Sequence, residues 1–125
     1  ECDIIRGMDV IPQEWIDKVT AFLDKRSAAS CIVTNTALEE WSLLFPDVFL
    51  SDLYDVLSAV LKNRSYTDSR LVKKMDEPGE VYEFLFPRAG KRLYSKINLC
   101  KGQLQIIVYS AHNQRLGNIR DGRFV

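Results

Sequence analysis

The chemistry that this chain could perform centres on its single histidine, His112, which follows an apolar run near the C-terminal end. Imidazole is the side chain whose unperturbed pKa lies closest to neutrality, so His112 is the natural candidate for acid or base catalysis. Lys96 and Tyr94 come shortly before it and offer a positive charge and a hydroxyl group. Cleaving RNA through its own 2′-hydroxyl needs a base, an acid and positive charge at the phosphate. We therefore take His112, Lys96 and Tyr94 as the candidate catalytic residues.

Basic and aromatic residues surround these three candidates. Arginine and lysine bind phosphate groups, and tyrosine rings offer flat surfaces on which unpaired bases stack. We therefore expect an RNA-binding surface made of Arg88, Lys91, Arg92, Tyr109 and Arg115. A simpler interpretation competes with this one, because the solvated face of an antiparallel sheet often carries lysine and tyrosine without any function.

The net charge of zero conceals an uneven distribution of charge along the chain. Residues 1–80 contain 9 Lys and Arg against 15 Asp and Glu, whereas residues 81–125 contain 8 against 2. A basic half of this kind indicates a surface for a polyanion or for an acidic partner. The alternative is that the two halves simply attract each other within the fold.

The composition, 46% hydrophobic and 27% charged, is that of an ordinary globular chain. No apolar run approaches the ~20 residues of a membrane helix, so we expect a soluble protein without a membrane partner. The cysteines Cys2, Cys31 and Cys100 are widely spaced and form no CxxC pair. This spacing indicates a reducing, cytoplasmic environment, and we expect neither a metal site nor a cofactor. The chain has no Walker, dinucleotide-binding, HExxH or GxSxG motif.

Three amphipathic helices are predicted within residues 12–64 from apolar side chains at helical spacing. The first begins at Pro12, a residue favoured at a first helical position. A capping box that starts at Thr36 predicts the second helix, and Pro46 ends it. Ser51 is expected to cap the third helix, which has the most continuous apolar stripe. A short run before the second helix, residues 31–33, is either a small strand or an extended connection.

Alternating apolar and polar residues predict three strands, at residues 80–86, 91–100 and 103–110. Short links join them into an antiparallel meander. The link Lys101-Gly102 has the length of a two-residue hairpin turn, with glycine available for positive φ. Such a turn would pair residues whose numbers sum to 203, for example Leu99 with Leu104.

In that register one face of the sheet is apolar and the other is polar, aromatic and basic. The polar face would carry Arg92, Tyr94, Lys96, Asn98, Gln105, Ile107 and Tyr109. His112 would belong to the apolar face, away from Lys96. A β-bulge, or the end of the strand after Ser110, would be needed to bring it to the polar face.

Three segments of the C-terminal half, at residues 81–86, 90–97 and 104–112, resemble the sheet of RelE-like toxin ribonucleases, in the superfamily of barnase, EndoU, colicin and RelE. The Tyr-x-Lys-Ile run that starts at Tyr94 is closest to the motility quorum-sensing regulator branch. The resemblance spans residues 50–112 and implies a helical part packed on an antiparallel sheet. It also implies messenger RNA cleavage without a metal until an antitoxin covers the protein. Lys96 and Tyr94 would be sheet-face site residues, and His112 would match the His or Tyr after the last strand.

We predict one α+β domain over residues 1–125, with helices at 12–64, an antiparallel sheet of three to four strands at 80–112 and a basic tail at 113–125. The first hypothesis is a metal-independent endoribonuclease toxin that cleaves messenger or transfer RNA and is neutralised by a cognate antitoxin or immunity protein. Such a toxin could be the C-terminal module of a larger protein. The second hypothesis is a non-catalytic module that binds nucleic acid or protein through the same sheet. The third is an acidic immunity or inhibitor protein that acts through its N-terminal helices.

Overall fold

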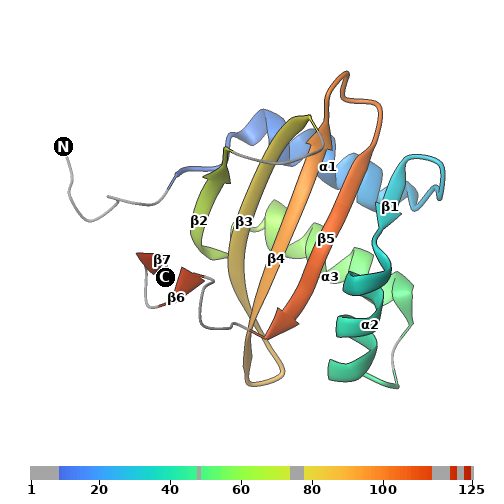
Figure 1. Ribbon diagram of the computed structural model, residues 1–125, viewed down its shortest axis with the longest axis vertical. Coiled ribbons are helices and arrows are strands. Elements are labelled where there is room, and N and C mark those ends of the chain that lie inside the picture. Colours follow the sequence, from blue (N-terminus) through green and yellow to red (C-terminus); the bar gives the residue numbers. More distant parts are fainter. Residues whose placement is uncertain (1–8, 48, 74–77, 114–118, 121–122, 125) are drawn as a thin grey trace.

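The computed structural model describes residues 9–47, 49–73, 78–113, 119–120 and 123–124, with the backbone alone from residue 110 onward. This part of the chain has an α+β fold (Figure 1), which confirms the predicted class. The helices are α1 (Gln13–Lys25), α2 (Asn35–Leu44) and α3 (Leu50–Lys62). The strands of the main sheet are β1 (Cys31–Val33), β2 (Thr67–Val72), β3 (Gly79–Arg88), β4 (Lys91–Cys100) and β5 (Ile106–Asn113). Two short strands, β6 (Ile119–Arg120) and β7 (Arg123–Phe124), pair with each other.

The three predicted helices are present, but the caps of two of them differ from the prediction. The N-cap of α2 is Thr34 and not Thr36, because the Thr34 hydroxyl accepts a 3.2 Å hydrogen bond from the backbone N–H of Ala37. At α3 the N-cap is Phe49 and not Ser51. There the Asp52 carboxylate accepts a 2.8 Å bond from the Phe49 backbone N–H. Both caps lie two residues earlier than expected: Thr34 supplies the capping hydroxyl at α2, and at α3 the Asp52 carboxylate binds the backbone of an apolar N-cap.

The three predicted strands form the expected antiparallel meander, β3-β4-β5, but the sheet as a whole is mixed, so the prediction of a purely antiparallel sheet is wrong. Its strand order is β1-β5-β4-β3-β2, in which β1 runs parallel to β5 and the other pairs are antiparallel. A three-residue strand such as β1 shows no periodicity, and nothing local reveals that it pairs with a strand far along the chain. Strand β2 was also missed, because its mostly polar sequence resembles a loop.

The link between β4 and β5 is longer than the predicted two-residue turn. It comprises residues 101–105, and Cys100 donates its backbone N–H to the Gln105 carbonyl at 3.0 Å across it. Leu99 consequently pairs with Ile106, and Leu104 lies in the link with 80% of its surface exposed. The predicted pairing of Leu99 with Leu104 is therefore wrong. The error is two residues, an even number, so the apolar face of β4 still meets the apolar face of β5.

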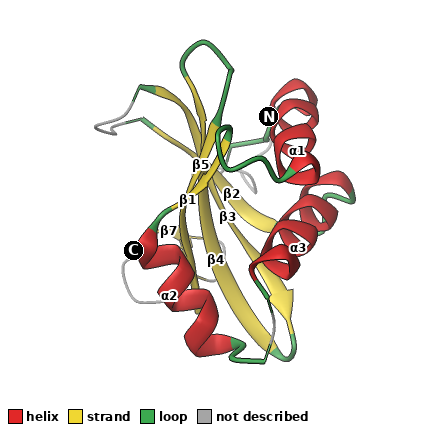
Figure 2. Cartoon of the chain, turned by 90° about the vertical axis from the view of Figure 1, so that its right-hand side faces the viewer, coloured by secondary structure: helices red, strands yellow, loops and turns green. Residues whose placement is uncertain are grey.

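Helices α1 and α3 cover one face of the sheet, while α2 lies on the other side, next to β1 and β5 (Figure 2). The core fills the space between the sheet and helices α1 and α3; its largest fully buried side chains include Trp15, Leu53, Leu57, Phe84, Phe86, Leu93 and Ile97. The Trp15 indole N–H donates to the Glu80 carbonyl at 3.0 Å and so ties α1 to β3. The opposite face of the sheet is therefore where polar side chains can gather.

Candidate functional site

Polar side chains from four neighbouring strands gather on the face of the sheet that α1 and α3 do not cover. We call this group the second sheet face; it consists of Arg70 from β2, Glu83 from β3, Tyr94, Lys96 and Asn98 from β4, and Tyr109 from β5. Glu83 pairs in register with Arg70 on one side and with Lys96 on the other. Side chains of directly paired residues share a face and lie about 5 Å apart at Cβ. The row across three strands is therefore basic, acidic, basic.

A β-bulge at Tyr109 changes the register of β5 beyond that point. Ile97 pairs with Val108, but Lys96 pairs with Ser110, so that Tyr109 is the extra residue in β5. His112 consequently pairs with Tyr94, a residue of the second sheet face. The sequence alone placed His112 with the apolar face unless a bulge intervened, and this bulge does intervene. The side chain of His112 lies outside the described residues.

Thr34, the cap of α2, holds the bulge from the neighbouring element. Its hydroxyl donates to the Tyr109 carbonyl at 3.1 Å, while its backbone N–H donates to the Val108 carbonyl at 3.0 Å. The same hydroxyl caps α2, so one side chain connects the start of that helix to the bulged strand. The path of β5 toward His112 thus depends on a residue about 75 positions earlier in the chain.

Tyr94 is buried in the sheet and not exposed as a stacking surface. Only 4% of its surface is accessible, and its ring packs against Leu85. Its hydroxyl donates a hydrogen bond to a carboxylate oxygen of Glu83. Burial, followed by that hydrogen bond and by the charges of Glu83 and Glu40, raises the pKa of the Tyr94 phenol far above its usual value. Tyr94 is therefore a permanent hydrogen-bond donor that orients Glu83.

Lys96 and Tyr109 form the more accessible part of the second sheet face, and both are half-buried. The Lys96 ammonium lies 5.7 Å from the centre of the Tyr109 ring, within the range of a cation–π contact. Beneath them, the fully buried Asn98 donates to the Tyr109 hydroxyl at 3.2 Å. Lys96 is therefore supported over an oriented ring, and one face of Tyr109 is used for that support.

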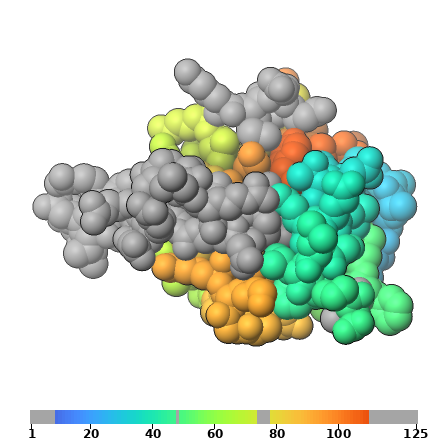
Figure 3. Space-filling view, turned by 60° about the horizontal axis from the view of Figure 1, so that its bottom comes forward, coloured from blue at the N-terminus to red at the C-terminus, as the bar shows by residue number. Residues whose placement is uncertain are grey.

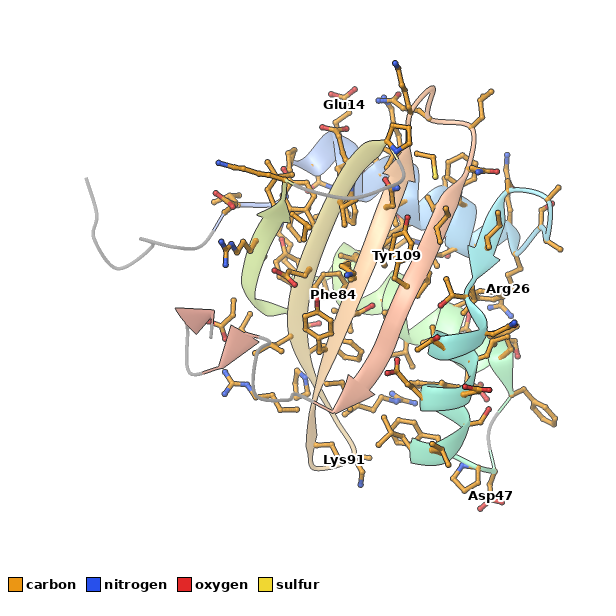
Figure 4. The ribbon with its side chains drawn as sticks, in the orientation of Figure 1. Glu14, Arg26, Asp47, Phe84, Lys91 and Tyr109 are labelled. Carbon is orange, nitrogen blue, oxygen red and sulfur yellow. The ribbon has the colours of Figure 1, made fainter. Side chains whose placement is uncertain are left out.

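The basic turn between β3 and β4 forms a second group of candidates at one end of the sheet. Arg88, Lys91 and Arg92 are exposed there, and Arg92 makes a 3.0 Å ion pair with Asp68 of β2. Figure 4 shows Lys91 at this lower end and Tyr109 nearer the middle of the sheet. The structure thus separates the predicted RNA-binding residues into a turn group and a face group. Arg115 lies outside the described residues.

Two residues of the second sheet face, Glu83 and Arg70, were missed by sequence reasoning. Glu83 is one of only two acids after residue 80, and that isolation among basic residues could have singled it out. Arg70 gave no usable signal, because β2 was not recognised as a strand. Strand register alone brings both residues beside Lys96.

Within the described ranges, no three His, Cys, Asp or Glu side chains come close enough together to hold a metal ion. The helices of the same ranges include none that is long and apolar enough to cross a membrane. Comparison with protein-family models, with curated proteins and with solved structures found no match for this chain. The function is therefore inferred from the chemistry of the second sheet face.

Proposed function

We propose that the chain is a metal-independent endoribonuclease that acts through the second sheet face. The bulge at Tyr109 is the observation that carries the proposal, because it pairs His112 with Tyr94 in the strand that also presents Lys96. A carboxylate, an ammonium group and an imidazole then belong to neighbouring positions of three strands. These are the groups that RNA cleavage by the 2′-hydroxyl needs.

In the proposed reaction Glu83 acts as the general base. It accepts the proton of a ribose 2′-hydroxyl, whose oxygen attacks the adjacent phosphorus. His112 protonates the departing 5′-oxygen, so the products are a 2′,3′-cyclic phosphate and a 5′-hydroxyl end. Lys96 and Arg70 flank Glu83 in the register and would neutralise charge on the phosphate. Tyr94 is a positioning residue here, since its buried hydroxyl is occupied with Glu83.

The basic turn of β3 and β4 would guide the RNA backbone toward this face. Its exposed arginine and lysine side chains, Arg88 and Lys91, provide positive charge at one end of the sheet. The resemblance to RelE-like toxins agrees with this arrangement and would add a cognate antitoxin or immunity protein as a partner. A substrate among messenger or transfer RNAs is part of the same proposal.

The test is cleavage of a single-stranded RNA in the presence of EDTA, comparing the wild type with Glu83→Gln, Lys96→Met and His112→Ala. Each substitution is expected to reduce the rate by about a hundredfold or more, as loss of one acid, base or charge commonly does. An RNA with a deoxyribonucleotide at the cleaved position should resist cleavage. Glu80→Gln and Lys25→Met are matched controls, because both residues are exposed and lie outside the second sheet face.

Cleavage at equal rates by the wild type and all three variants would reject this site. Salt-sensitive RNA binding without cleavage would favour the non-catalytic binding module. If RNA is neither bound nor cut, the acidic N-terminal helices become the working surface, as the inhibitor hypothesis requires.

A further inference from the structure

The corner where α2 leads into α3 exposes large apolar side chains. Leu43, near the end of α2, is 83% exposed, and Phe49, just before α3, is 78% exposed. Leu50, the first residue of α3, is also exposed. Among the described residues only six large apolar side chains are exposed in total, so half of them lie within eight positions of one corner. Such a concentration is typical of an interaction surface.

Hydrogen bonds hold the end of α2 and the start of α3 on the two sides of this corner. The backbone N–H of Phe45 donates to the Trp41 carbonyl at 2.9 Å and ends α2, and the Phe45 ring packs on Trp41 with centroids 4.6 Å apart. At the start of α3, Phe49 is held through its backbone by the Asp52 carboxylate. Phe45 therefore packs inward, whereas Leu43 and Phe49 face the solvent.

The stretch of sequence that forms the corner carries charge of a single sign. Between residues 27 and 61 the sequence has five acidic residues and no lysine or arginine. Glu39 on α2 and Asp47 in the connection are exposed beside the apolar side chains. Figure 4 places Asp47 at the end of α2, and Figure 3 shows α2 at the same end of the molecule as the basic β3–β4 turn. Acidic side chains beside apolar ones attract the cationic side chains of a partner.

We propose that the α2–α3 corner, defined as Glu39, Leu43, Asp47, Phe49 and Leu50, docks a protein segment that presents apolar and cationic side chains on one face. The apolar side chains of the segment would cover Leu43 and Phe49, and its lysines or arginines would meet Glu39 and Asp47. A basic amphipathic helix has this arrangement. The inference is independent of the proposed ribonuclease activity, because the corner contains no residue of the second sheet face.

The probe is a fluorescent synthetic peptide of leucine and lysine in an amphipathic helical order, titrated with the full chain and followed by anisotropy. Saturable binding is expected, and it should weaken by about tenfold or more in Leu43→Ser/Phe49→Ser. Glu39→Lys/Asp47→Lys should weaken binding and reduce its dependence on salt. Leu104→Ser is the matched apolar control, since Leu104 is 80% exposed on the β4–β5 link. Glu80→Lys is the matched charge control, and circular dichroism checks that every variant is folded.

The proposal is overturned if the double serine variant binds the peptide as tightly as the wild type or as Leu104→Ser. It is also overturned if a peptide with glutamate in place of lysine binds equally well. Self-association in sedimentation equilibrium that Leu43→Ser/Phe49→Ser abolishes would assign the corner to a second copy of the chain. Binding to phosphatidylglycerol vesicles that the same variant abolishes would assign it to a lipid surface. Either of these last results would contradict a cationic protein partner.

Discussion

The hydroxyl of Tyr94 on β4 donates a hydrogen bond to the carboxylate of Glu83 on β3, diagonally across the strand pair. The phenol ring is buried, while the carboxylate is half-buried and flanked in register by Arg70 and Lys96. The bond therefore connects the interior of the sheet to its charged surface. It fixes the orientation of the one acid in the row, whether the surface cleaves RNA or only binds a partner.

Replacing Tyr94 with phenylalanine should remove this bond and keep the packing of the ring. We expect the free energy of unfolding to fall by roughly 1–3 kcal/mol, because a charge-assisted hydrogen bond is lost from a partly buried carboxylate. Urea unfolding followed by circular dichroism measures the change. Tyr66→Phe is the matched control, since within the described part of the chain the Tyr66 hydroxyl accepts a bond from the exposed Arg64. Equal stability of the two variants would show that the Tyr94 bond contributes nothing.

Ionisation of the same tyrosine should lower the free energy of unfolding at alkaline pH. The folded state raises the pKa of Tyr94 above the ordinary tyrosine value of 10.0, so the unfolded chain releases this proton at a lower pH than the folded one. The contribution is complete below pH 10 and is lost as the pH rises from there toward the folded pKa, at up to about 1.4 kcal/mol per pH unit. Tyr94→Phe should therefore flatten the alkaline decline. The pKa values of Tyr54, Tyr66 and Tyr82 are raised too, so a residual slope is expected. An unchanged slope would contradict the burial of the Tyr94 phenol.

The start of β3 should tolerate no side chain at Gly79. A Cβ atom there would lie 2.1 Å from the Asn98 Oδ1 and 2.6 Å from the Leu99 carbonyl oxygen, and the backbone φ is +151°. Gly79→Ala should lower the free energy of unfolding by more than about 2 kcal/mol, and should also disturb the Asn98 support of Tyr109. Gly90→Ala is the control, because a Cβ there meets nothing within 4 Å despite a φ of +76°. Its cost should be close to 1 kcal/mol. Similar losses in thermal unfolding of both variants would rule out the clash.

The sequence allowed the helices and the three inner strands, β3, β4 and β5, to be predicted because their patterns are local. The apolar stripe from Leu53 to Leu61 specifies a helix by itself, and the alternation over residues 91–100 specifies a strand. The faces of β4 were also predictable, since an error of two residues in register leaves every side chain on its own face. What could not be predicted is set by contacts between distant segments, such as the parallel pairing of Cys31 with Ile106.

The candidate site also combines features that local sequence patterns predict with features that only contacts between distant segments determine. Tyr94, Lys96 and Tyr109 could be assigned to one face from alternation, but the burial of Tyr94 could not. Alternation alone predicts that a tyrosine on the polar face of a strand is exposed, because the local pattern does not show which other segments cover that face. Glu83 becomes a candidate site residue only because it pairs with Lys96, and this register is a property of the strand pair.

Thr34 offers the sharpest test of how the bulge at Tyr109 is held. Its hydroxyl accepts from the Ala37 N–H and donates to the Tyr109 carbonyl, so Thr34→Ala removes a helix cap and a bond to the bulge together. We expect the free energy of unfolding to fall by roughly 1–3 kcal/mol, while Thr36→Ala, which alters the exposed residue first expected to be the cap, should change it by less than about 0.5 kcal/mol. Thr34→Ser keeps the hydroxyl and should recover most of the loss.

Because β5 continues from the bulge to His112, Thr34→Ala should also change the amide chemical shifts of β5 beyond Tyr109 more than those of residues 106–108. An effect confined to the first turn of α2 would show that Thr34 only caps the helix and that the bulge is maintained by β4 and β5 themselves.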